Sequence, residues 1–275
     1  ITMGEQLVKQ LLPHLDKVTW PTHPAVTAQG REAYAIGLDK VESYSGDPRT
    51  LAEALRIFVS GGSAPYAFAG AAYVLLAASL ETDGSYFPAG LDKAMMWLEK
   101  AQALEPDLTD INMIEAFVYV YHGRFPDARL VLDYLKGQEP DNYHVLLADV
   151  AYWQQMGDPE KTTAAVGTAV NAAQTPPQRL RLRSQLADFY LSVGKPDDAL
   201  AIYKESVHFD PQNPLLWHKV SAAYFQKGEL EEAERANQQS LRLGSLPAAQ
   251  QMAEQIKARR KGESGILGLG GLFKR

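Results

Sequence analysis

The sequence predicts an all-α fold, a right-handed superhelical solenoid of antiparallel helical hairpins. Two consecutive segments, 180–210 and 214–243, can be laid on one another with their landmark residues 34 positions apart. Each segment contains apolar residues at helical spacing, then a short turn with a glycine, then a second helix. The matched landmarks are Tyr190 with Tyr224, Gly194 with Gly228, and Ala199 with Ala233. A fixed period of this length is typical of stacked helical hairpins, each of which packs only on its neighbours.

These landmarks resemble those of the tetratricopeptide repeat family. The residues that match its first helix and turn are Trp217, Val220, Ser221, Tyr224, Gly228 and Ala233, and the earlier copy adds Tyr203 and Pro211. The resemblance covers roughly residues 64–260. It implies a non-catalytic adaptor, assembly factor or specialised chaperone. In such proteins the first helix of each hairpin lines a concave groove, which binds a peptide or a helix of a partner protein.

The N-terminal region, residues 1–62, predicts helices that lack the repeat landmarks. Leucines at helical spacing predict a short amphipathic helix over residues 4–17. Prolines at 21 and 24 end it, since a proline disfavours helix at the preceding residue. Two further helices follow on either side of a turn at 45–48, where Pro48 is placed to begin the second of them. We interpret this region as a divergent or capping hairpin, as terminal repeats commonly are.

The array itself is predicted over residues 63–245. Second helices of its first two hairpins again match at 34 positions: Ala94, Leu98, Ala101 and Pro106 precede Ala128, Leu132, Leu135 and Pro140. The first hairpin has an enlarged turn at 81–90, either a neutral insertion or a functional loop. After the last hairpin, residues 246–262 predict a capping helix, and residues 263–275 form a tail rich in glycine and leucine.

Composition excludes several classes of function. The chain has 275 residues, a formal charge of −6 and no cysteine. The acidic balance argues against a nucleic-acid partner, and the lack of cysteine excludes disulfides and favours a reducing cytoplasm. No apolar stretch is long enough to insert into a membrane. None of the six histidines has the spacing of a helical zinc motif, and no phosphate loop or nucleophile motif is present. We therefore expect no catalytic residue, no metal and no cofactor.

The candidate site is the concave groove that the resemblance implies. Counting from the repeat landmarks, its expected lining residues are Met113, Phe117, Tyr121, Leu147, Gln154, Arg181, Ser184, Asp188, His218 and Phe225. Met113, Phe117, Tyr121 and Phe225 would anchor apolar side chains of a peptide, while Arg181, Asp188 and His218 would orient it. The alternative is that individual residues of this set pack between repeats. The Lys and Asn pattern with which family members clamp a C-terminal carboxylate is absent from the corresponding positions.

The tail is the second candidate. Because leucines alternate with glycines in it, we expect an extended docking peptide rather than a helix. Its expected contact residues are Leu267, Leu269, Leu272, Phe273, Lys274 and Arg275. The run from Leu267 to Leu272 followed by basic residues resembles the peptides that load cargo into encapsulin shells, although Gly271 and Phe273 depart from that pattern. Three alternatives stay open: a client role in which the tail docks on a larger assembly, self-association through the tail, and a disordered end.

Overall fold

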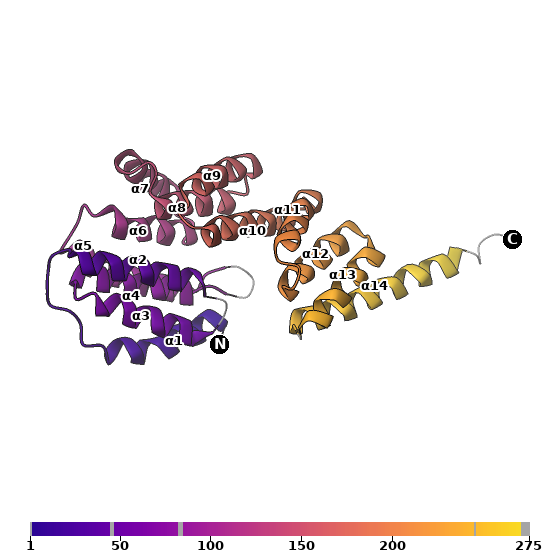
Figure 1. Cartoon of the computed structure of the whole chain (residues 1–275), viewed down its shortest axis with the longest axis horizontal. Helices are drawn as coiled ribbons and strands as arrows, with labels where there is room; N and C mark the ends of the chain where they lie inside the picture. Colours follow the sequence, from indigo (N-terminus) through magenta and orange to yellow (C-terminus); the bar gives the residue numbers. More distant parts are fainter. Residues whose placement is uncertain (1, 45–46, 82–84, 245, 271–275) are drawn as a thin grey trace. The chain divides into compact units, whose positions relative to one another are not determined.

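The computed structural model describes residues 2–44, 47–81, 85–244 and 246–270, the part beyond Lys261 in its backbone only. Over these residues the chain forms fourteen α-helices and no extended strand (Figure 1). The predicted all-α fold of helical hairpins is confirmed. No helix in the described part of the chain is both long and apolar enough to cross a membrane.

The helices fall into two compact units, residues 1–156 and 157–275. The first unit contains α1 (Met3–Asp16), α2 (Ala28–Glu42), α3 (Pro48–Ser60), α4 (Ala64–Ala78), α5 (Pro88–Gln102), α6 (Thr109–Tyr121), α7 (Phe125–Gln138) and α8 (Tyr143–Gln155). The second unit contains α9 (Pro159–Ala172), α10 (Pro176–Ser192), α11 (Pro196–Phe209), α12 (Pro214–Lys227), α13 (Leu230–Leu243) and α14 (Pro247–Gly270). The division falls inside the array that the sequence predicts over 63–245.

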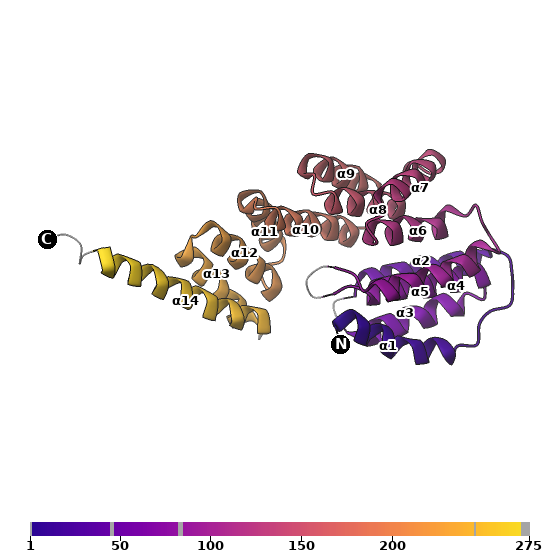
Figure 2. The ribbon, with the colours of Figure 1, turned by 180° about the vertical axis from the view of Figure 1, so that it is seen from behind.

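In the first unit, α4 is the central helix. It contacts α1, α2, α3, α5 and α6 (Figure 2). Thirteen of its fifteen residues are buried, as expected for a helix that is apolar all around. Its small residues permit close approach: the ring of Phe58 from α3 lies against Gly70 of α4 on one side and Gly37 of α2 on the other. These two glycines make room for a ring that is fully buried.

The enlarged turn after α4 holds the start of α1. The Glu81 carboxylate accepts hydrogen bonds from the backbone N–H of Gly4 at 2.9 Å and from the Thr2 hydroxyl at 2.5 Å. A negative charge at this position also suits the positive end of the helix dipole. Further along the turn, Leu80 and Tyr86 form an isolated antiparallel bridge. This turn therefore has a structural role in the first unit.

The regular hairpins have matching glycine turns. The turn glycines with positive φ are Gly123 (73°), Gly157 (66°), Gly194 (74°) and Gly228 (81°). At Gly194 and Gly228 the next residue donates its N–H to a tyrosine carbonyl of the preceding helix, Lys195 to Tyr190 at 2.8 Å and Glu229 to Tyr224 at 3.0 Å. When a glycine after a helix adopts the left-handed backbone conformation, N–H groups that follow can donate to carbonyl groups of the last turn, which would otherwise lack a hydrogen-bond partner. The predicted period of 34 residues thus appears as repeated backbone geometry.

The last helix is longer than the sequence suggested. We predicted a capping helix that ends by residue 262, followed by an extended tail, whereas α14 continues to Gly270. Glycine costs a helix about 1 kcal/mol per residue relative to alanine. Elongating a helix that is already formed, however, needs no new nucleus. The prediction of an extended backbone at Leu267 and Leu269 is therefore wrong.

Candidate functional site

The groove residues predicted on α6 and α8 are mostly buried. Met113 is 0% exposed, Phe117 4% and Leu147 8%. The reason is that α6, which holds Met113 and Phe117, contacts α4, α5, α7 and α8, and that α8, which holds Leu147, packs against α6 and α7. For these three residues the prediction of a groove contact is wrong, and they form part of the core of the first unit.

Two other predicted groove residues of the first unit are half-buried. The ring of Tyr121 stacks on that of Tyr86, with 3.8 Å between centroids and 14° between planes. Burial raises the pKa of Tyr121, and the phenol stays neutral at physiological pH. Gln154 is half-buried near the end of α8. The chain's own loop therefore occupies the aromatic surface that we expected a partner to contact.

In the second unit the predicted residues remain accessible. Arg181, Ser184 and Asp188 follow one another at i, i+3 and i+7 along α10, a spacing that places them on one face of a helix. Arg181 and Ser184 are half-buried and Asp188 is exposed. On α12, His218 and Phe225 are half-buried. We call the surface formed by these faces of α10 and α12 the α10–α12 face.

A hydrogen-bond network crosses the α10–α12 face. The Lys219 ammonium lies 2.7 Å from one oxygen of Asp188 and donates to the Ser184 hydroxyl at 3.0 Å. The other oxygen of Asp188 accepts from the Tyr203 hydroxyl at 2.5 Å. Burial and the hydrogen bond to Asp188 raise the pKa of Tyr203. Asp188 thus holds α10, α11 and α12 together, and both of its oxygens are already engaged.

Replacing Asp188 by alanine is expected to lower the free energy of unfolding of the second unit by about 1–3 kcal/mol, because the buried Tyr203 hydroxyl loses its acceptor. The matched control is Asp197→Ala, which breaks an exposed ion pair with Lys227 and should change stability little. Urea titrations followed by circular dichroism measure both variants. Equal effects of the two substitutions would contradict the assignment of Asp188 to this network.

His218 lies beside the network with an unsatisfied ring nitrogen. Burial, and then the charge of Lys219, lower the pKa of His218. Its Nδ1 atom is buried and has no hydrogen-bond partner among the described residues. A buried polar atom without a partner costs free energy. A polar group of a ligand that reached it would recover this cost.

Phe225 is contacted by the C-terminal helix. It packs against a cluster that contains Met252 and Ile256 of α14. The Arg259 guanidinium lies 5.1 Å from the centroid of its ring and donates to its carbonyl oxygen at 2.9 Å. Part of the apolar surface predicted for a peptide at Phe225 is therefore covered by α14.

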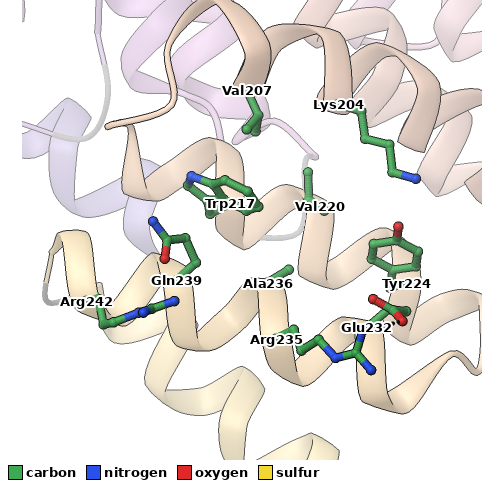
Figure 3. A pocket seen from close by; sticks show the side chains of 10 residues that line it. All are labelled: Lys204, Val207, Trp217, Val220, Tyr224, Glu232, Arg235, Ala236, Gln239 and Arg242. Atoms are coloured by element: carbon green, nitrogen blue, oxygen red, sulfur yellow. Dashed lines mark hydrogen bonds and ion pairs between the residues drawn. The ribbon is translucent and has the colours of Figure 1, made fainter.

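Another helix face of the second unit contains a pocket that the sequence did not reveal (Figure 3). It has a volume of about 370 Å³. The lining residues are Lys204 and Val207 from α11, Trp217, Val220 and Tyr224 from α12, and Glu232, Arg235, Ala236, Gln239 and Arg242 from α13. We call it the α11–α13 pocket. Trp217, Val220 and Tyr224 were recognised as repeat landmarks, but the repeat pattern assigns them to packing. The sequence feature that could have indicated this pocket is the presence of basic residues, Lys204 on α11 and Arg235 and Arg242 on α13, on the second helices of two consecutive hairpins.

The remaining candidates give less information. Leu267 and Leu269 lie within α14, where only the backbone is described. Leu272, Phe273, Lys274 and Arg275 lie outside the described residues. Within the described part of the chain, no cluster of three or more His, Asp or Glu side chains could hold a metal ion.

The antiparallel hairpins, with turn glycines that recur every 34 or 37 residues at positions 123, 157, 194 and 228, define a helical-repeat protein. The chain matches the tetratricopeptide repeat family model over residues 190–258, from the end of α10 into α14. A tetratricopeptide repeat protein from Parabacteroides merdae is similar, with 15% identity, coverage of 86% of this chain and 88% of that chain, and a TM-score of 0.52. Yeast Tom70 is similar over 99% of this chain and 61% of its own, with 12% identity and a TM-score of 0.50. Residues 190–258 are therefore the part of the chain that matches the tetratricopeptide repeat family.

Proposed function

We propose that this protein is a non-catalytic interaction scaffold, which binds a peptide or a helix of a partner protein on the α10–α12 face. The observation that carries the proposal is the combination of accessible apolar surface and an unsatisfied polar atom on one helix. Leu215 on α12 is 48% exposed. It lies three residues before His218, whose Nδ1 lacks a partner among the described residues, and this spacing puts both side chains on the same face.

The chemistry of the face suits a peptide. The exposed Leu215 side chain offers an apolar contact, and the half-buried imidazole of His218 lies on the same face of the helix. The Ser184 hydroxyl and the Arg181 guanidinium lie on the facing helix. Apolar contacts with a few polar groups that fix orientation are typical of peptide grooves. The proposed groove is therefore smaller than the one predicted from sequence, because the positions on α6 are buried.

Affinity capture from native cell extract, followed by mass spectrometry, tests this function. We expect Leu215→Asp to lose the partner, because a carboxylate cannot enter an apolar contact without a large desolvation cost. The matched control is Phe209→Asp, which makes a comparable change at a residue that is 72% exposed at the end of α11. The control variant should retain the partner.

A chain that ends at Glu263 supplies the third arm of the experiment. If the partner is lost from this truncated chain but retained by Leu215→Asp, the tail is the binding element and the client role replaces the scaffold. Retention of the same partners by all three variants would also refute the proposed face. Circular dichroism spectra of each variant establish that the helices are intact.

A further inference from the structure

The α11–α13 pocket lies on a different side of α12 from the proposed peptide groove. An α-helix turns by about 100° per residue. The stripe formed by Trp217, Val220 and Tyr224 is therefore rotated by roughly 160° from the stripe that contains Leu215 and His218. A ligand in the pocket would not compete for the same surface as a peptide on the α10–α12 face. The pocket thus offers the second unit an independent site.

The floor of the pocket is apolar and only partly covered. Val220 and Ala236 are buried, whereas Trp217, Tyr224 and Val207 are half-exposed. Trp217 donates its indole N–H to the Pro211 carbonyl at 2.9 Å, which fixes the orientation of the ring at one end. Figure 3 shows these side chains between the helices α11 and α13. A volume of about 370 Å³ is sufficient for one or two large apolar side chains, which bury most of their surface in such hollows.

The rim of the pocket has the opposite charge balance from the whole chain. The chain carries a formal charge of −6, yet the lining has three cationic side chains and one carboxylate. Arg235 is engaged with the acidic residue Glu232 at 2.9 Å. Among the described residues, neither Lys204 nor Arg242 has an ion-pair partner; the Lys204 ammonium lies instead 5.1 Å from the ring centroid of Tyr224. Two cations at opposite edges of an apolar floor are therefore available to a ligand.

We propose that the α11–α13 pocket binds an acidic peptide segment of a partner protein. A large apolar side chain of this segment would enter between α11 and α13 and contact Trp217 and Val207. Carboxylates on either side of it would pair with Lys204 and Arg242, and an arginine can do so with two parallel hydrogen bonds. The apolar contact supplies most of the affinity, while the charges select an acidic sequence and orient it.

Fluorescence anisotropy with a defined probe tests this site. The probe is a fluorescein-labelled peptide, Glu-Asp-Glu-Glu-Phe-Leu-Glu-Asp-Glu-Gly, and its matched control has Ser-Ser in place of Phe-Leu. The full chain is expected to bind the probe and to bind the control at least about tenfold more weakly. Affinity for the probe should fall as the salt concentration rises from about 0.05 to 0.5 M, because exposed charges are then screened.

Two substitutions locate the probe in the pocket. Arg242→Glu should weaken binding at least about tenfold by replacing attraction with repulsion, and Gln239→Trp should weaken it similarly by filling the hollow without a change in charge. Lys257→Glu, at an exposed site on α14, makes the same change in net charge as Arg242→Glu and should alter affinity less than about twofold. Arg242→Gln is a milder variant for use if the charge reversal disturbs folding.

Three results would overturn the proposal. One is the absence of probe binding at millimolar protein. Another is equal weakening by Arg242→Glu and Lys257→Glu, which would reduce the effect to net charge. The third is binding that survives Gln239→Trp and Arg242→Glu but is lost in Leu215→Asp, which would move the peptide to the α10–α12 face. This last result would leave the proposed scaffold function intact, so the two proposals can fail separately.

Discussion

Replacing Gly70 by alanine is expected to destabilise the first unit by about 1–3 kcal/mol through overpacking. A Cβ atom at Gly70 would lie 2.1 Å from Cγ and 2.4 Å from Cδ2 of Phe58. The ring has little room to move away, because Gly37 of α2 packs closely against its Cε1 and Cδ1 atoms. Carbon atoms at optimal contact are about 3.5–4.0 Å apart, so α3 or α4 must shift. The direction of the effect is unusual, since an alanine in place of a helical glycine normally stabilises a helix by roughly 0.5–1 kcal/mol.

The matched control is Gly137→Ala in α7 of the same unit, where nothing lies within 4 Å of an added Cβ. It should be neutral or slightly stabilising. Urea titration followed by tryptophan fluorescence in a Trp217→Phe background reports on the first unit alone, because the remaining tryptophans Trp20, Trp97 and Trp153 all belong to it. Combining Gly70→Ala with Phe58→Leu should recover part of the loss. If both glycine variants shift the urea midpoint in the same direction, the steric explanation is wrong.

The repeated hairpins could be predicted because their signals are local. A turn glycine at a fixed interval is required wherever the backbone adopts positive φ, and Gly194 and Gly228 meet this requirement. Proline at the start of a helix is equally local, and Pro48, Pro196 and Pro214 begin the helices that contain them. These features need only the residues of one hairpin, so the period of the array follows from the sequence.

The groove was predicted less well because burial depends on neighbours that are distant in the sequence. Met113 and His218 occupy comparable places in their repeats, yet Met113 is fully buried and His218 is not. The difference arises because α4 and α8, as well as α5 and α7, contact α6. Helical periodicity identifies a face of a helix but does not say what covers it. The α11–α13 pocket was missed for a related reason, since its lining comes from three helices.

Acidification is expected to destabilise the first unit through His144 at the start of α8. Its side chain is 20% exposed, and burial lowers its pKa to about 4 although the carboxyl groups of Asp39 and Asp110 act in the opposite direction. The Glu42 carboxyl lies 3.1 Å from Nε2, but the two atoms are not aligned for a hydrogen bond. The Tyr143 ring packs edge-on against the imidazole, with 5.1 Å between centroids. The fold therefore favours the neutral imidazole.

The size and direction of this pH dependence follow from proton linkage. The unfolded chain binds a proton at His144 near pH 6.5, whereas the folded chain does so only near pH 4. Between these values the unfolded state binds more protons, so stability is complete above about pH 6.5 and is lost as the pH falls towards 4. The contribution of His144 amounts to about 3 kcal/mol over this window. Urea titrations at several pH values, in the Trp217→Phe background, should show the free energy of unfolding falling as the pH is lowered through this range. We call this dependence the pH slope of the free energy of unfolding.

His144→Gln should reduce the pH slope of the free energy of unfolding by the contribution of this imidazole, because glutamine keeps a polar side chain that does not titrate. Carboxylates that titrate in the same range will leave a residual slope in both proteins, so the difference between the two proteins is the quantity to measure. His14→Gln, which makes the same replacement at an exposed histidine of the same unit, is the matched control. If His144→Gln and the reference chain lose stability in parallel between pH 6.5 and pH 4, the buried imidazole is not responsible.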